Sequence, residues 1–215
     1  MVKLDIVSDV ACPWCHVGRA YLWRALEARP DHPFEIEWHP HEINPGIPAG
    51  GMDRAEYMAA KFGSREAVVR AHEPLLAHAA ASGAEFDLPA IRRTPNTRDA
   101  HRLIYWAGLE GRQSPMVERL MRAYWAEGED IGETATLVRL AGEVGLDAAM
   151  TARLLEGGAD RQEIAARERH SRERGVSAVP TFIIANRYVL QGAQPTEVWL
   201  KVMDELAERS ARASR

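Results

Sequence analysis

The residues of this sequence best suited to chemistry are two cysteines, Cys12 and Cys15, which are separated by Pro13 and Trp14. A C-x-x-C spacing suits a dithiol that cycles with a disulfide, one half of a metal site, or two small apolar residues that are neighbours by chance. Pro13 stands at the predicted first position of a helix, where its missing N–H has no partner to lose. The pattern therefore places Cys12 at the N-cap of that helix.

An N-cap cysteine faces unpaired backbone N–H groups and the positive end of the helix dipole, and both favour the thiolate. Cysteines in such settings titrate at about 3.5 to 7.5 instead of about 8.5. We expect Cys12 to be the exposed nucleophile and Cys15, one turn into the helix, to be the shielded thiol that resolves a mixed disulfide. Trp14 would offer a flat apolar surface to a substrate, with ordinary packing as the alternative. His16 would add positive charge beside Cys15 if its ring points toward the sulfurs.

The segments around the cysteines predict a mixed α/β order. Residues 3–8 alternate polar and apolar as a strand, a helical pattern follows the cysteines, and residues 34–39 alternate again, which makes a βαβ unit. Helical patterns then fill roughly 45–160. Strand patterns return in 181–192, which we expect to be a hairpin, and a helix follows from residue 195 to about 208. The last residues of the chain are expected to be frayed.

Several helix boundaries carry sequence signals. Asp53 with a glutamate three residues later is typical of a capping box, and Ser64 is a second candidate cap. Asp160, again followed by a glutamate at the third position, predicts the start of the last polar helix of the middle segment. The positions expected to pack inward from the final helix are Val198, Leu200, Val202 and Leu206.

The order of these motifs resembles a known family. The segments SDVACPWCHVG, HEINPGIP, TPNTRDAHRLIYWA, GVSAVPTFII and GAQP are similar, in this order, to the DsbA-like branch of the thioredoxin superfamily. The similarity is greatest to the cytosolic FrnE-type subgroup, which is related to 2-hydroxychromene-2-carboxylate isomerases and kappa glutathione transferases. The resemblance implies a thioredoxin fold with an all-helical domain inserted between its βαβ and ββα halves. The expected thioredoxin-like domain is 1–44 plus 161–215, and the expected inserted helical domain is 45–160.

The resemblance also implies roles for residues far from the cysteines. It makes Pro180 a cis-proline that lies against Cys12, and it makes the backbone of Val179 the part that pairs with a bound peptide, as in β-strand addition. Without the resemblance, a proline that caps a strand is the simpler interpretation, because only about 5 to 6% of X–Pro bonds are cis. The inserted domain would border a substrate groove, whose candidate residues are His16, Asn96, Arg98 and His101.

The expected function is thiol–disulfide exchange through the CPWC dithiol. The expected partners are protein or glutathione-type thiols and disulfides, a recycling reductase and a second copy of the chain in a homodimer. The first alternative is a glutathione-dependent small-molecule isomerase or transferase of the same fold, whose relatives normally have serine where this chain has Cys12. The less favoured alternative is a zinc module formed by Cys12, Cys15, His39 and His41. Structural zinc sites usually space their histidines by three to five residues, and here one residue separates them.

Composition narrows the classes further. The chain has 215 residues and is 46% hydrophobic, enough for a globular core. A net charge of −4 is unlike the positive charge typical of nucleic-acid-binding proteins. No apolar run approaches the roughly 20 residues that span a bilayer. No secretory signal precedes the first strand pattern, so a cytoplasmic location is expected. A lone cysteine pair there favours catalysis over a structural disulfide. We expect no resident metal or cofactor, because no phosphate loop or dinucleotide fingerprint occurs.

Overall fold

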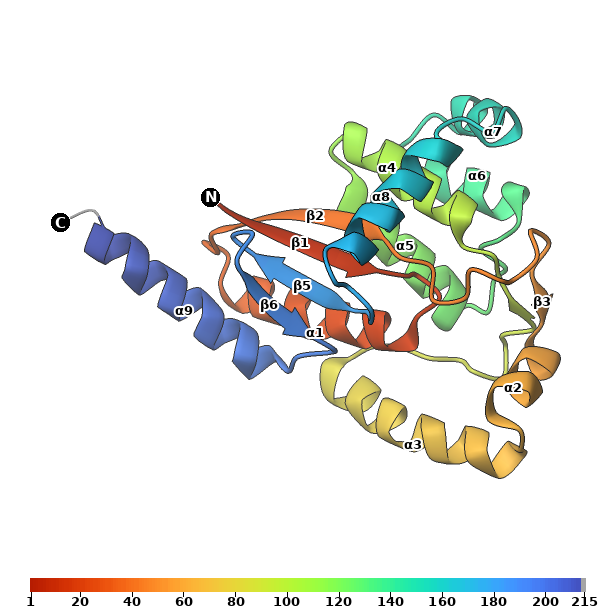
Figure 1. Ribbon diagram of the computed structural model, residues 1–215, viewed down its shortest axis with the longest axis horizontal. Helices are drawn as coiled ribbons and strands as arrows, with labels where there is room; N and C mark the ends of the chain where they lie inside the picture. Colours follow the sequence, from red (N-terminus) through yellow and green to blue (C-terminus); the bar gives the residue numbers. More distant parts are fainter. Residues whose placement is uncertain (214–215) are drawn as a thin grey trace.

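A four-stranded sheet joins the two ends of the chain in the computed structural model, which describes residues 1–213 (Figure 1). Its strands are β1 (Val2–Ser8), β2 (Phe34–Pro40), β5 (Thr181–Ile184) and β6 (Tyr188–Gln191), in the order β2-β1-β5-β6. β1 is parallel to β2, with Ile6 opposite Trp38, whereas β5 is antiparallel to both β1 and β6. The predicted βαβ start and C-terminal hairpin are therefore both present, and they share one sheet.

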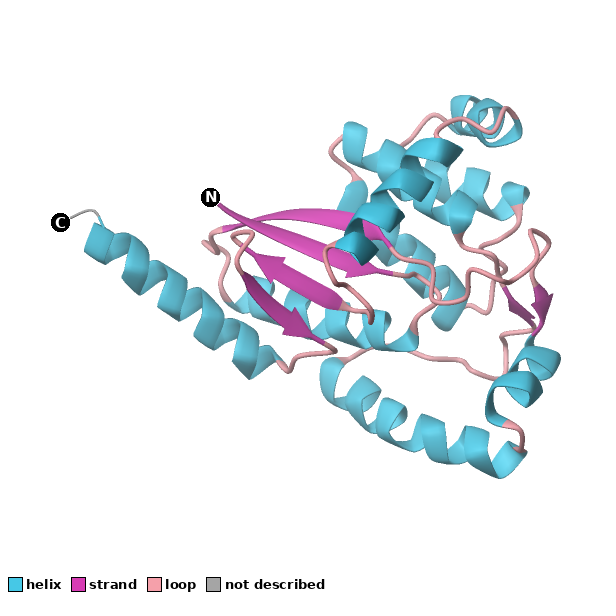
Figure 2. Cartoon of the chain, in the orientation of Figure 1, coloured by secondary structure: helices cyan, strands magenta, loops and turns pink. Residues whose placement is uncertain are grey.

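Helices surround this sheet and fill the middle of the chain (Figure 2). Over residues 1–213 they are α1 (Pro13–Ala28), α2 (Arg54–Phe62), α3 (Arg65–Ser82), α4 (Arg98–Leu109), α5 (Gln113–Trp125), α6 (Thr134–Glu143), α7 (Ala148–Glu156), α8 (Arg161–Glu173) and α9 (Thr196–Ala213). Helices α2 to α8 all lie between β2 and β5 in the sequence, so the α/β fold has a helical insertion as predicted. The domain boundaries themselves stay a prediction. No helix in this described part of the chain is long and apolar enough to cross a bilayer.

A second, very short sheet was not predicted. It pairs β3 (Met52–Asp53) with β4 (Arg93–Thr94) in antiparallel register. Two-residue strands are too short to show an alternating pattern, so periodicity has no means of detecting them. This ladder ties the start of α2 to the segment that precedes α4.

The predicted helix caps are partly confirmed. The Asp53 carboxylate accepts hydrogen bonds from two amides of the first turn of α2, and the Ser64 hydroxyl accepts one from the first turn of α3. The prediction of a side-chain cap at Asp160 is wrong, although α8 does begin directly after it. Asp160 has a left-handed backbone, with φ of 58°, and its carboxylate accepts a hydrogen bond from the Trp106 indole at 2.8 Å. The Asp160 carboxylate therefore binds the Trp106 indole instead of capping α8.

The C-terminal helix is longer than predicted. It continues to Ala213 instead of fraying near residue 208, and the last two residues lie outside the described part of the chain. The four positions expected to pack inward are half-buried, and three of them, Leu200, Val202 and Leu206, pack against the core. Trp199 and Met203 are fully buried beside them. The Trp199 ring packs edge-on against Phe182 of β5, with 4.7 Å between ring centroids. The largest side chain of α9 therefore faces the sheet.

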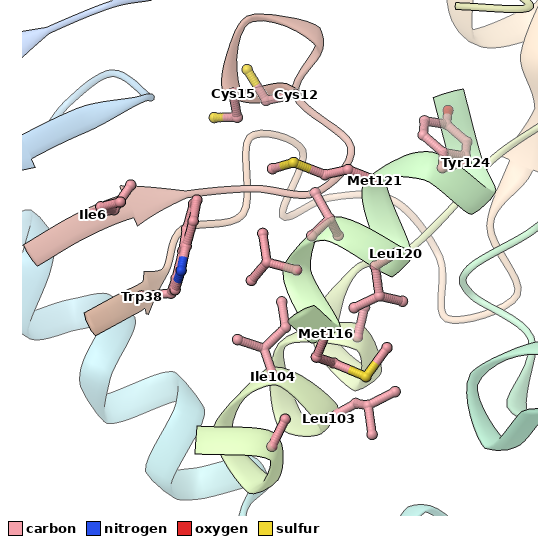
Figure 3. Close-up of a cluster of buried hydrophobic side chains, with 14 of the residues drawn as sticks. Ile6, Cys12, Cys15, Trp38, Leu103, Ile104, Met116, Leu120, Met121 and Tyr124 are labelled. Carbon is pink, nitrogen blue, oxygen red and sulfur yellow. The ribbon is translucent and has the colours of Figure 1, made fainter. Parts of the chain in front are cut away.

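One hydrophobic core joins the sheet, the inserted helices and both cysteines (Figure 3). Ile6 and Trp38 extend from the sheet into the cluster, and Leu103 and Met121 meet them from α4 and α5. The buried residues of α4 and α5 include Leu103, Ile104, Leu120, Met121 and Trp125. The cysteine loop is thus packed against the inserted helices as well as against the sheet.

Candidate active site

The N-terminus of α1 is built around Cys12, as the sequence predicts. Cys12 is the N-cap, with an extended backbone, and Pro13 occupies the first helical position. The Cys12 carbonyl accepts hydrogen bonds from the amides of Cys15 and His16 at 3.1 and 3.3 Å. The Cys12 amide in turn donates to the carbonyl of Asp9 at 3.0 Å. These bonds fix both cysteines on one helical turn, with the Cys12 sulfur at the positive end of the helix.

The prediction that Cys12 is exposed is wrong. Only 6% of Cys12 and 1% of Cys15 are accessible to solvent. Figure 3 shows Met121 of α5 beside the two cysteines, and from the opposite half of the fold the Val179 carbonyl lies 3.8 Å from the Cys12 sulfur. These neighbours come from segments that are far from the cysteines in the sequence. Only a small part of Cys12 is therefore accessible to a partner.

The two thiols have opposite pKa shifts. A hydrogen bond from the Cys15 thiol lowers the pKa of Cys12 below the ordinary cysteine value, even though burial opposes this shift. The pKa of Cys15 is raised well above the ordinary cysteine value, mainly because this thiol is buried. Both residues are free thiols. Cys12 is consequently the sulfur that ionises first, and Cys15 is the one that keeps its proton.

A proline loop lies against the dithiol. The peptide bond between Val179 and Pro180 is cis, and the Pro180 carbonyl accepts a hydrogen bond from the Gly192 amide at 2.8 Å. Gly18 of α1 faces this loop, and a Cβ at that position would lie 3.1 Å from the Pro180 ring. A glycine thus allows α1 to approach the loop closely. Val179 is half-buried, so its backbone borders the site.

Trp14 and His16 both serve packing in this structure. Trp14 is half-buried, and its ring meets the edge of the His78 ring of α3 with 5.5 Å between centroids. His16 is 6% exposed and points away from solvent, with its Nε2 donating to the Glu85 carbonyl at 3.1 Å. Burial lowers the pKa of His16 to about 4. The suggestion that His16 adds positive charge is therefore wrong, because the ring is neutral near pH 7.

A buried acid behind the cysteine loop was missed. Asp9 is 1% exposed, and its two carboxylate oxygens accept hydrogen bonds from the amides of Ala11 and Ile43. His101 of α4 lies beside it, with 3.6 Å between Nε2 and the carboxylate. Burial alone would raise the pKa of Asp9, but His101 and the two amides lower it. The negative charge of Asp9 in turn raises the pKa of the nearby thiols. In the sequence, an acidic residue three positions before Cys12 could have indicated this site.

The predicted groove residues are divided between two environments. Asn96 donates to the Ile47 carbonyl at 2.8 Å, and Arg98 forms an ion pair with Glu42 at 3.0 Å. Both line a cavity of about 660 Å³ between the loop after β2, the start of α4 and α8. His16 and His101 do not line it. The four candidates therefore do not form one surface.

The histidines of the zinc alternative lie elsewhere. His39 Nε2 lies 2.8 Å from a carboxylate oxygen of Asp5, and His41 is buried. Among the described residues, potential metal ligands that lie within 4.8 Å of one another are found at Asp5, Glu37 and His39, a group without either cysteine. Lys3 forms ion pairs with both acids of this group. The fold does not assemble the proposed Cys₂His₂ set.

The sequence also matches a known protein family. Residues 3–204 match the family model of the DSBA-like thioredoxin domain. The chain belongs to this family. A probable DsbA oxidoreductase from Streptomyces coelicolor is 31% identical to it, with a TM-score of 0.83 over 95% of this chain and 89% of the other. The resemblance seen in the sequence is thereby confirmed at the level of the DsbA-like family.

Two further solved structures share the fold at lower identity. A 2-hydroxychromene-2-carboxylate isomerase is 16% identical, with a TM-score of 0.75 over 99% of this chain and all of its own (100%). The cytosolic disulfide reductase DsbM from Pseudomonas aeruginosa, solved with glutathione, is 22% identical, with a TM-score of 0.67 over 96% of this chain and 99% of DsbM. Similarity at this level shows a common fold. It leaves the specific activity to be argued from the site.

Proposed function

We propose that this protein catalyses thiol–disulfide exchange through Cys12 and Cys15, on protein or glutathione-type substrates. The observation that carries the proposal is the asymmetry of the pair. One sulfur at a helix N-cap has a lowered pKa, and its neighbour on the same turn has a strongly raised one. A nucleophile and a resolving thiol need this difference, because the first must be ionised before the substrate arrives and the second only afterwards.

In the reducing direction, the Cys12 thiolate attacks one sulfur of a substrate disulfide. The new bond joins Cys12 to that sulfur, and the other substrate sulfur leaves as a thiolate. Cys15 then loses its proton to water and attacks the Cys12 sulfur, which releases the second substrate thiolate. The substrate has gained two electrons, and the protein now holds the Cys12–Cys15 disulfide. The oxidising direction is the same sequence in reverse.

The substrate is proposed to lie beside the loop before Pro180. The Val179 carbonyl is 3.8 Å from the Cys12 sulfur and the residue is half-exposed, so an extended peptide that pairs with this backbone would bring its sulfur toward Cys12. Trp14, which lies between the two cysteines in the sequence, is also partly exposed. This arrangement uses main-chain recognition and therefore accepts many substrate sequences.

A reductive role in the cytosol fits the proposal best. The glutathione pool there is strongly reducing, and about 30 mV of potential difference corresponds to about 1.4 kcal/mol for a two-electron couple. The fold is shared with a protein described as a cytosolic disulfide reductase solved with glutathione, which supports glutathione as a recycling thiol. A glutathione-dependent isomerase of the same fold remains the alternative. It requires no Cys12–Cys15 disulfide in its cycle.

Trapping of a mixed disulfide tests the proposal. In Cys15→Ser the resolving sulfur is absent, so incubation with oxidised glutathione or a disulfide peptide should leave one adduct on Cys12, seen by intact-protein mass spectrometry. Cys12→Ser is the matched control and should form far less adduct, because Cys15 is more buried and its pKa is raised. Absence of an adduct in Cys15→Ser, or equal adducts in both variants, would contradict the proposed roles.

A further inference from the structure

The cavity described above is lined by neither cysteine of the dithiol. Its volume of about 660 Å³ falls within the range of small-molecule sites, about 300 to 1,000 Å³. Helix α8 forms one wall, and Figure 1 shows α8 lying next to α4 on the side of the fold that carries the inserted helices. The opposite wall is the loop after β2, which contributes Pro45 and Ala49.

The charges of the lining do not balance. Five arginines face three carboxylates. Three of the arginines are matched one to one, in the pairs Arg98 with Glu42, Arg102 with Asp99, and Arg172 with Glu168. The other two, Arg161 and Arg169, form no ion pair with any residue in 1–213, and both side chains are exposed. The cavity therefore carries two uncompensated positive charges.

The positions of these two arginines indicate the shape of a ligand. Arg161 and Arg169 are eight residues apart on α8, which corresponds to about 12 Å along the helix axis. The side chains of Ile164 and Ala165 line the cavity between them. A molecule with an anionic group at each end and an apolar middle matches this order of charge, apolar surface and charge.

We propose that this cavity binds an elongated small molecule that carries two separated anionic groups, carboxylates or phosphates, held by Arg161 and Arg169. The proposal goes beyond disulfide exchange and does not depend on it. The site is nevertheless linked to the dithiol loop. Glu42 of the cavity wall precedes Ile43, whose amide donates to the Asp9 carboxylate at 2.8 Å, and Asp9 is three residues before Cys12.

Calorimetric titration with defined anions tests the proposal. The probes are a series of α,ω-dicarboxylates from succinate to sebacate, with monocarboxylates of equal chain length for comparison. One long dicarboxylate should bind at least tenfold more tightly than its monocarboxylate, and added salt should weaken it. Inorganic phosphate and 1,6-hexanediol bisphosphate show whether phosphate is preferred over carboxylate as the anionic group.

Variants then locate the binding. The double variant Arg161→Gln/Arg169→Gln should weaken the best probe at least tenfold, and Arg161→Lys/Arg169→Lys should retain most of the affinity. The matched control is Arg65→Gln/Arg70→Gln, which removes two exposed arginines from α3 and should change nothing. The proposal is overturned if no probe binds, if monocarboxylates bind as tightly as dicarboxylates, or if the α8 and α3 double variants behave alike. Mixed-disulfide trapping in the same variants reports on the dithiol separately.

Discussion

Replacing Gly18 with alanine tests how closely α1 must approach the loop before β5. A Cβ at this position would lie 3.1 Å from the Pro180 Cγ, 3.4 Å from the Ala193 Cα and 3.5 Å from the Phe182 ring. These neighbours are two rings and a backbone atom, so none can move away by a simple rotation. Overpacking of this kind costs about 1 to 3 kcal/mol. In a helix interior, alanine is more favourable than glycine by about 0.8 to 1 kcal/mol, which offsets part of this cost. We expect a net destabilisation of about 1 kcal/mol.

Urea unfolding measures this difference, and Gly142→Ala supplies the control. Gly142 is also helical, in α6, but a Cβ there would meet only the Ala148 side chain at an ordinary distance of 3.7 Å. The control should therefore be stabilised, by up to about 1 kcal/mol, through helix propensity alone. If Gly18→Ala is stabilised as much as Gly142→Ala, the close approach of α1 to Pro180 is not a constraint and the packing argument fails.

Three further results are expected. Burial lowers the pKa of His16 to about 4. The neutral ring therefore makes its full contribution to stability above about pH 6.5, and this contribution is lost as the pH falls toward 4. In urea unfolding over that window, the free energy of unfolding of the wild type should fall by up to about 3 kcal/mol more than that of His16→Gln. Cys15→Ala, which removes the hydrogen bond to Cys12, should raise the pKa of Cys12 in a thiolate absorbance titration, whereas Cys15→Ser, which keeps a donor, should raise it less. Trp125→Phe breaks the indole bond to the Val10 carbonyl and should cost about 1 to 3 kcal/mol; an unchanged midpoint in denaturant would show that this contact is dispensable.

The parts of the fold that depend on local sequence were predictable. Pro13 after a strand pattern placed Cys12 at the N-cap, and Asp53 and Ser64 capped the helices expected of them. These features arise from side chains acting within a few residues of themselves, where spacing is informative.

What could not be predicted comes from contacts between distant segments. Cys12 belongs to a core cluster that also contains Met121, and its sulfur lies near the Val179 carbonyl; both residues are far from it in the sequence. The Asp9 site requires His101 from α4, and no local pattern pairs them. Asp160 has a cap signal that is overridden by the Trp106 indole. In each case the tertiary contact, which periodicity does not encode, decides where the side chain points.

The proposed reaction requires that Cys12 and Cys15 form a reversible two-electron couple. The most direct test equilibrates the protein in glutathione buffers of stepped ratio, quenches with acid, and counts free thiols by alkylation and mass spectrometry. The expected result is one transition between two free thiols and a Cys12–Cys15 disulfide, absent from Cys12→Ser. A wild type whose thiols never join at any ratio, or that carries only glutathione adducts, would contradict it and favour the isomerase alternative.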